Sequence, residues 1–242
     1  MIPKIIHQTW KSKDIPHHLR GFQESWLHHH PGWEYRFWDD AANEALIAEH
    51  YPEFLDHSCR ATPTILRVDL VRLAYLHRHG GVYADLDYEV IRPLDDLLDT
   101  PHAIVGRERG GIGSVMRGHD YVINALMASP PGHPLWLEVM HGMVRAYRPR
   151  RVLESHTRYV IRMAIAILDD RVESHLKGDG DMIVLPSDAL YPSIPTQRIT
   201  DHRRREAVAR GAYGIHYYEN SWRSPLARLV NHGRVAVQRC FR

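Results

Sequence analysis

The stretch Val68–Val90, VDLVRLAYLHRHGGVYADLDYEV, decides the fold of this 242-residue chain. It reads as a helix, a Gly-Gly turn, a short apolar strand and two carboxylates one residue apart. We expect the helix to begin with Thr62 as N-cap and Pro63 at its first position. Gly80 and Gly81 supply the left-handed C-cap and the reversal. Because apolar residues lie almost all round the helix, it is predicted to be buried rather than amphipathic.

Charged residues in this stretch lie in elements that are predicted to be buried, where an unpaired charge lowers the stability of the fold. Asp69 and Arg72 are three residues apart and therefore neighbours on one face of the buried helix. A buried charge destabilises the fold unless it is paired or bound. Asp85 and Asp87 lie at the carboxyl end of the strand Val82–Ala84. Ligands of open α/β sheets bind at that edge, and both aspartates point to the same side if the strand continues.

Two carboxylates this close repel each other and favour a cation between them. Their hard oxygen atoms suit Mg2+ or Mn2+, which commonly complete their coordination with phosphate oxygens. The alternative is a solvated turn with two incidental acids, because a lone Asp-x-Asp is common. Asp69, Arg72, the double glycine and Tyr83 around the motif favour the metal site.

The pattern as a whole resembles a known family. Asp69-x-x-Arg72, followed by Gly80-Gly81-Val82-Tyr83-x-Asp85-x-Asp87, is similar to the sugar-binding region with the DXD motif of glycosyltransferase family 32. The glucosylating domains of large clostridial toxins share this pattern. The resemblance implies a GT-A-like α/β fold, with a mixed, mostly parallel sheet flanked by helices. We expect residues 1–242 to form one such domain of a short, bacterial-type member, with a basic tail at about 223–242.

Composition limits the partners and the compartment. Charged residues make up 25% and the net charge is +2, so nothing points to nucleic acid. The two cysteines, Cys59 and Cys240, suggest neither a disulfide framework nor a zinc site. No signal peptide and no apolar run of about 20 residues is visible. We therefore expect a cytoplasmic protein, and the basic amphipathic tail favours either peripheral contact with the inner face of the cell membrane or a packed terminal helix.

The N-terminal run Ile2–Trp10 resembles the family signature Ile-Pro-Lys-x-Ile-His-Gln-x-Trp and is predicted to be a buried strand. In the family this aromatic residue sits at the nucleotide base, where a flat ring stacks. The plainer interpretation of Trp10 is core packing. The other expected elements are helices at 19–30, 41–50 (capped by Asp39 and Asp40), 121–128 and 135–148, and strands at 33–38, 103–106 and 182–185.

The C-terminal part resembles the family at Ala212–Trp222. The resemblance implies that Ser221 and Trp222 close over the donor and that His216 lies near the metal. A neutral imidazole is a competent ligand for Mn2+-class ions, and a third ligand fits a two-carboxylate half-site. Glu219 and Ser221 are alternative ligands. Where family members carry Thr-Gly-Pro, this chain has Glu154–Thr157.

The function implied is a metal-dependent retaining hexosyltransferase, using Mn2+ (or Mg2+) and a UDP- or GDP-sugar donor, with a glycan or lipid-linked acceptor. Asp69, Arg72 and Asp85 are the expected catalytic residues, and Asp85, Asp87 and His216 the metal ligands. The expected donor-binding residues are Trp10, Asp69, Arg72, Tyr83, Asp85, Ser221 and Trp222.

Two other functions remain open at this point. The missing Thr-Gly-Pro motivates a pseudoenzyme that binds a sugar nucleotide without transferring the sugar. The Asp-x-Asp motif also occurs in phosphatases of the haloacid-dehalogenase kind. In those it normally comes on the first strand, whereas Asp85 and Asp87 follow three structural units.

Overall fold

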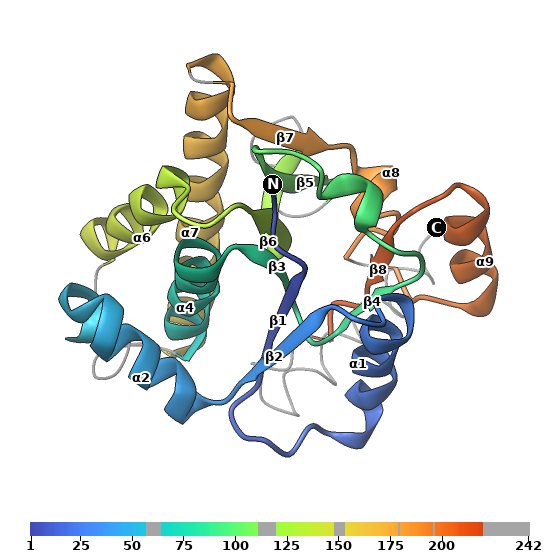
Figure 1. Cartoon of the computed structure of the whole chain (residues 1–242), viewed down its shortest axis with the longest axis horizontal. Coiled ribbons are helices and arrows are strands. Elements are labelled where there is room, and N and C mark those ends of the chain that lie inside the picture. The colour runs from blue at the N-terminus through green and yellow to red at the C-terminus, as the bar shows by residue number, and fades with distance from the viewer. Residues whose placement is uncertain (57–63, 111–119, 148–152, 179, 196, 220–242) are drawn as a thin grey trace.

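The computed structural model describes residues 1–56, 64–110, 120–147, 153–178, 180–195 and 197–219. Its centre is a six-stranded sheet in the order β2-β1-β3-β6-β5-β7 (Figure 1). β6 runs antiparallel to both of its neighbours, and the other strands share one direction. The strands are β1 (Ile5–Thr9), β2 (Glu34–Trp38), β3 (Gly81–Ala84), β5 (Ala103–Glu108), β6 (Tyr121–Ser129) and β7 (Met182–Leu185). The expected mixed, mostly parallel sheet is confirmed.

Helices cover the sheet in two groups, and a small second sheet accompanies one of them (Figure 1). The group drawn at the left is α2 (Asp40–His50), α4 (Thr64–His79), α6 (Pro134–Ala146) and α7 (Leu153–Lys177). On the other side lie α1 (His17–His29), α8 (Ser187–Leu190), α9 (Asp201–Ala209) and the antiparallel pair β4 (Tyr88–Val90) and β8 (Gly214–His216). Single 3-10 turns occur at Pro52–Phe54 and Asp95–Leu97. No helix in the described ranges is both long enough and apolar enough to cross a bilayer.

The helix α4 is buried as predicted, and the turn after it needs its glycines. Gly80 and Gly81 have φ angles of 66° and 92°, in the left-handed region that favours glycine. A Cβ on Gly81 would lie 2.5 Å from the carbonyl oxygen of Ile5. The close approach lets β3 enter the sheet directly beside β1. The predicted cap, Thr62 and Pro63, lies outside the described residues.

The predicted helix at 121–128 is wrong, because this segment is the nine-residue strand β6. Nearly all of its side chains are buried, so apolar periodicity cannot separate a central strand from a buried helix. Pairing with β3 on one side and β5 on the other decides the outcome. Ala125–Ala128 are good helix formers by themselves, and the tertiary context overrides that preference.

The other elements predicted from the sequence agree with the structure to within a few residues. Asp39 caps α2 as predicted, with its side chain accepting a hydrogen bond from the Ala42 backbone N–H at 2.9 Å. Several predictions fall outside the described residues and stay predictions. These concern the tail 223–242, both cysteines, the side chains of 154–157, and Ser221 and Trp222.

Candidate active site

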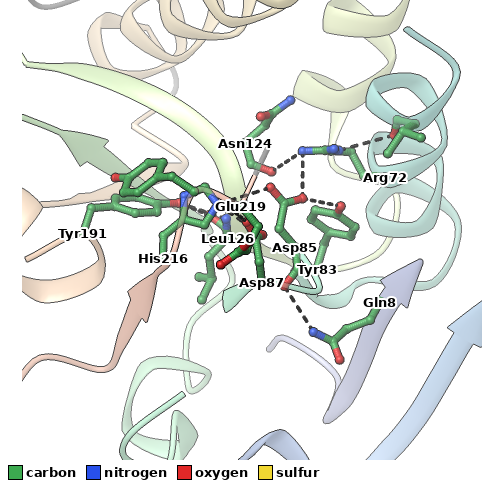
Figure 2. A network of polar contacts seen from close by, with 12 residues as sticks. Gln8, Arg72, Tyr83, Asp85, Asp87, Asn124, Leu126, Tyr191, His216 and Glu219 are labelled. Atoms are coloured by element: carbon green, nitrogen blue, oxygen red, sulfur yellow. Dashed lines mark hydrogen bonds and ion pairs between the residues drawn. The ribbon is translucent and has the colours of Figure 1, made fainter. Parts of the chain in front are cut away.

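Asp85 is fixed by both strands that flank β3. Its backbone N–H donates to the Ala125 carbonyl of β6 at 2.8 Å, and its carbonyl accepts from Gln8 Nε2 of β1 at 3.2 Å. Its side chain is held through Oδ1, which accepts from the Tyr83 hydroxyl at 2.6 Å and lies 3.2 Å from Arg72 Nη1 (Figure 2). One carboxylate oxygen therefore anchors the side chain, and Oδ2 points toward His216.

Asp87 has the same division between its two oxygens. Its Oδ2 accepts from the Glu219 backbone N–H at 2.7 Å, while Oδ1 lies 3.3 Å from His216 Nε2. His216 Nε2 is also 3.8 Å from Asp85 Oδ2. The register of the second sheet brings the imidazole here, because His216 on β8 pairs with Tyr88 on β4, next to Asp87. The structure thus brings together the three residues predicted as metal ligands.

These three side chains fit a divalent cation. One ligand atom from each lies within 4.8 Å of the others. Two carboxylate oxygens and one imidazole nitrogen form a donor set that suits Mn2+-class ions. Burial raises the pKa of Asp85, although Arg72 opposes this shift. Burial by itself would lower the pKa of His216, but the neighbouring carboxylates of Asp87 and Asp85 together outweigh burial and raise this pKa above its usual value.

Asp69 and Arg72 form a second polar group that joins the first. Asp69 Oδ1 accepts from Asn124 Nδ2 at 2.9 Å and lies 3.4 Å from Arg72 Nη2. Arg72 also donates from Nη1 to the Asn124 carbonyl at 2.9 Å, and its guanidinium lies over the Tyr83 ring at 4.8 Å. Both charged side chains are 5% exposed. Burial raises the pKa of Asp69 to about 6 against the pull of Arg72. Arg72 is thus shared between Asp69 and Asp85.

Asn124 is the site residue that sequence reasoning missed. Its place in a predicted helix hid it, whereas in β6 its amide donates a hydrogen bond to Asp69. The available signal was one amide side chain inside the apolar run Tyr121–Ala128. A lone polar residue in a buried segment needs a hydrogen-bond partner, and the partner here is the Asp69 carboxylate.

Trp10 lies one residue beyond β1, and its backbone N–H donates to the Trp38 carbonyl at 3.1 Å. Its indole Nε1 is buried without a hydrogen-bond partner in the described part of the chain. Tyr83, predicted to contact the donor, is buried, and its described hydrogen bond holds Asp85. Glu219, an alternative metal ligand, contributes its backbone N–H to Asp87. Ser221 and Trp222 cannot be placed because they are not described.

Fold and site together define an α/β protein with a carboxylate–imidazole centre at the carboxyl end of its central strands. Residues 16–103 match the family model of the glycosyltransferase sugar-binding region containing the DXD motif. This match includes α4, the double glycine and both aspartates. Over this part, which is less than half of its length, the chain is similar to the DXD-motif glycosyltransferases.

Curated relatives agree with this similarity. The chain is 38% identical over 144 residues to inositol phosphoceramide mannosyltransferase 3 of Schizosaccharomyces pombe, which covers 60% of this chain and 38% of that protein. It is also 38% identical over 143 residues to mannosyl phosphorylinositol ceramide synthase SUR1 of Saccharomyces cerevisiae, covering 59% of this chain and 35% of that one. The match therefore spans well under half the length of these relatives.

A solved structure supports the fold. PaToxG glycosyltransferase superposes with a TM-score of 0.50 at 14% identity, over 87% of this chain and 85% of that one. At this identity the likeness concerns the fold alone. It confirms the GT-A-like arrangement expected from the sequence.

Proposed function

We propose that this protein is a metal-dependent retaining hexosyltransferase that takes its sugar from a UDP- or GDP-sugar. One observation carries the proposal. Asp85 Oδ2, Asp87 Oδ1 and His216 Nε2 face one another, while the other oxygen of each carboxylate is held by the protein. Side chains fixed in this way present ligand atoms without further rearrangement, which is how a preformed cation site is built.

Asp85, Asp87 and His216 are the proposed cation ligands. A bound Mn2+ or Mg2+ would supply Lewis-acid neutralisation of the departing nucleoside diphosphate. Asp69 is the proposed ligand for sugar hydroxyls, because its described contacts use only Oδ1. Arg72 lowers the pKa of both Asp69 and Asp85 against the effect of burial, orients both carboxylates, and adds positive charge near the leaving group. Trp10 is proposed to contact the nucleotide base.

The acceptor proposed is a glycan or a lipid-linked acceptor. The support comes from the two yeast relatives, which are an inositol phosphoceramide mannosyltransferase and a mannosyl phosphorylinositol ceramide synthase. Retention of configuration, and hence an α-linked product, is proposed from the family resemblance. A donor sugar bound at the proposed cation site would lie near the carboxylates of Asp69 and Asp85. In the described part of the chain, both carboxylates form ion pairs with Arg72.

Thermal melting with a panel of UDP- and GDP-sugars, each with and without Mn2+, tests the proposal. Asp87→Asn keeps the shape and removes the charge, and Asp99→Asn changes an exposed aspartate as control. A donor at about 100 times its Kd stabilises the native state by about 2.7 kcal/mol. We expect an Mn2+-dependent shift with one nucleotide class, lost in Asp87→Asn and kept in Asp99→Asn.

Three results would contradict the proposal. Absence of a shift with every nucleotide sugar at saturating Mn2+ removes the donor site. A shift without sugar transfer or donor hydrolysis, when acceptor glycans and glycolipids are supplied, indicates the pseudoenzyme. Turnover of a generic phosphate ester, abolished by Asp87→Asn, would indicate the phosphatase.

A further inference from the structure

Tyr218 has a backbone conformation that aromatic residues rarely adopt. Its φ is 54°, and no other non-glycine residue in the described ranges has a positive φ. In this region the Cβ of an L-residue is crowded, so a bulky side chain persists there only when its surroundings impose the conformation. The residue lies between His216 and Glu219, which both contact Asp87.

The left-handed turn brings two backbone amides to the same aspartate. The Tyr217 N–H donates to the Asp87 carbonyl at 3.0 Å, which continues the β4–β8 pairing by one residue. Two residues later the Glu219 N–H donates to Asp87 Oδ2 at 2.7 Å. In an extended strand, alternate N–H groups at this spacing point the same way and lie far apart. The positive φ of Tyr218 folds the chain back over the Asp87 side chain, where Figure 2 shows Glu219.

The Tyr218 ring supports His216 at the same time. The two ring centroids are 4.1 Å apart with an interplanar angle of 42°. The rings of Tyr88 and Tyr191 lie farther from the imidazole, at 6.1 and 6.3 Å. Tyr218 is therefore the nearest of these three aromatic neighbours, and its position limits the rotation of His216 about its side-chain bonds.

The hydroxyl end of Tyr218 is anchored away from the metal-binding atoms. It donates to the Ser193 carbonyl at 3.2 Å and is in hydrogen-bond contact with the carboxylate of Glu108. Glu108 on β5 is 3% exposed and also accepts from the Tyr121 hydroxyl at 2.7 Å. The Tyr218 side chain is thus connected to the main sheet through Glu108. The backbone on either side of Tyr218 is fixed by the hydrogen bonds of Tyr217 and Glu219 to Asp87.

We infer that Tyr218 is a positioning residue that orients His216 and Asp87 for cation binding, through its ring and its left-handed backbone. The inference rests on the proposed function, because it assumes that these two residues bind a divalent cation. It adds a residue that supplies none of the three proposed ligand atoms. Its effect is to reduce the number of conformations that the ligands must give up when the cation binds.

Direct Mn2+ binding tests the inference without measuring transfer. Free Mn2+ is counted by its EPR signal during titration of the whole chain. We expect Tyr218→Ala to weaken Mn2+ binding at least tenfold and Tyr218→Phe, which keeps the ring, to stay within about threefold. Tyr218→Gly also lacks the ring but tolerates the positive φ, so it should bind more tightly than Tyr218→Ala. Tyr213→Ala, in a tyrosine that stacks on Arg92, is the control and should bind like wild type.

The outcomes separate this inference from the proposed function. Far-UV circular dichroism and metal-free melting establish that each variant is folded. Mn2+ binding by Tyr218→Ala within threefold of wild type overturns the inference, provided that Asp87→Asn has lost binding. Equal Mn2+ affinity of Tyr218→Gly and Tyr218→Ala overturns the part of the inference that concerns the left-handed backbone of Tyr218. Failure of the wild type to bind Mn2+ instead overturns the metal part of the proposed function.

Discussion

Replacing Arg72 with methionine should expose how strongly the two carboxylates depend on one guanidinium. Arg72 Nη2 lies 3.4 Å from Asp69 Oδ1 and Nη1 lies 3.2 Å from Asp85 Oδ1, with the arginine and Asp69 side chains each 5% exposed. Methionine retains much of the packing volume and removes the charge. Breaking a buried ion pair by removing one partner costs about 3–5 kcal/mol, because the other charge stays buried. We expect Arg72→Met to lose that much unfolding free energy near pH 8.

The loss should shrink as the pH falls, because Asp69 can take up a proton. Burial raises the pKa of Asp69 to about 6 from 3.8 in the unfolded chain, and Arg72 pulls it down. Without Arg72 this pKa rises further. Between that new pKa and about pH 6, only the variant's folded state gains a proton. Its unfolding free energy therefore rises by up to about 1.4 kcal/mol per pH unit as the pH falls, while that of the wild type does not.

Urea unfolding followed by tryptophan fluorescence at pH 8 and pH 6 measures both effects. The double variant Asp69→Asn/Arg72→Met completes a thermodynamic cycle. Because asparagine carries no charge, the double variant should be more stable near pH 8 than Arg72→Met alone. The claim that Arg72 compensates a buried Asp69 charge would be refuted by two results together. These are an equal loss of unfolding free energy by Arg72→Met at pH 8 and pH 6, and a double variant whose loss equals the sum of the losses of the two single variants.

Two further predictions concern the elements that position the site. Trp38 Nε1 donates to His7 Nδ1 at 3.1 Å, so the His7 proton lies on Nε2 and is donated to the Gly80 carbonyl at 2.9 Å. Burial lowers the pKa of His7 from 6.5 to about 3, so its stabilising effect is complete above about pH 6.5 and declines as the pH falls below that. The slope is at most about 1.4 kcal/mol per pH unit, and His7→Gln should flatten the stability–pH curve between pH 7 and 5 in urea unfolding. Gly81→Ala should destabilise the fold several times as much as Gly32→Ala. Both glycines have φ near 92°, but only at Gly81 would the new Cβ meet a backbone atom, at 2.5 Å. Equal melting temperatures of the two variants would contradict this prediction.

The core of the site could be predicted from sequence because its parts are local. A buried helix, a double glycine and a short apolar strand occupy one continuous stretch, so Asp69, Arg72, Asp85 and Asp87 could be placed by periodicity and turn chemistry alone. His216 lies 129 residues beyond Asp87 and could be joined to it only through a family resemblance. The structure confirms that the two meet at 3.3 Å.

The parts that sequence reasoning missed depend on pairing between distant segments. The prediction of a helix at 121–128 is wrong because apolar periodicity does not separate a central strand from a buried helix, and the strands on either side override the helix preference of Ala125–Ala128. With β6 misassigned, the amide of Asn124 could not be connected to Asp69. The role of Tyr218 was equally hidden, since no sequence pattern predicts a left-handed tyrosine.

The arrangement explains why so many buried polar groups gather at one edge of the sheet. Asp85 and Asp87 each give one oxygen to the protein and keep one toward His216, and the partners of the first oxygen come from α4, β3 and the segment after β8. Replacing these groups with apolar residues could stabilise the fold, since buried ion pairs often contribute little net stability. Their retention makes sense if the fixed oxygens orient the other two. In that case a variant such as Arg72→Met loses orientation as well as stability, and its cation affinity should fall even at the pH where its stability recovers.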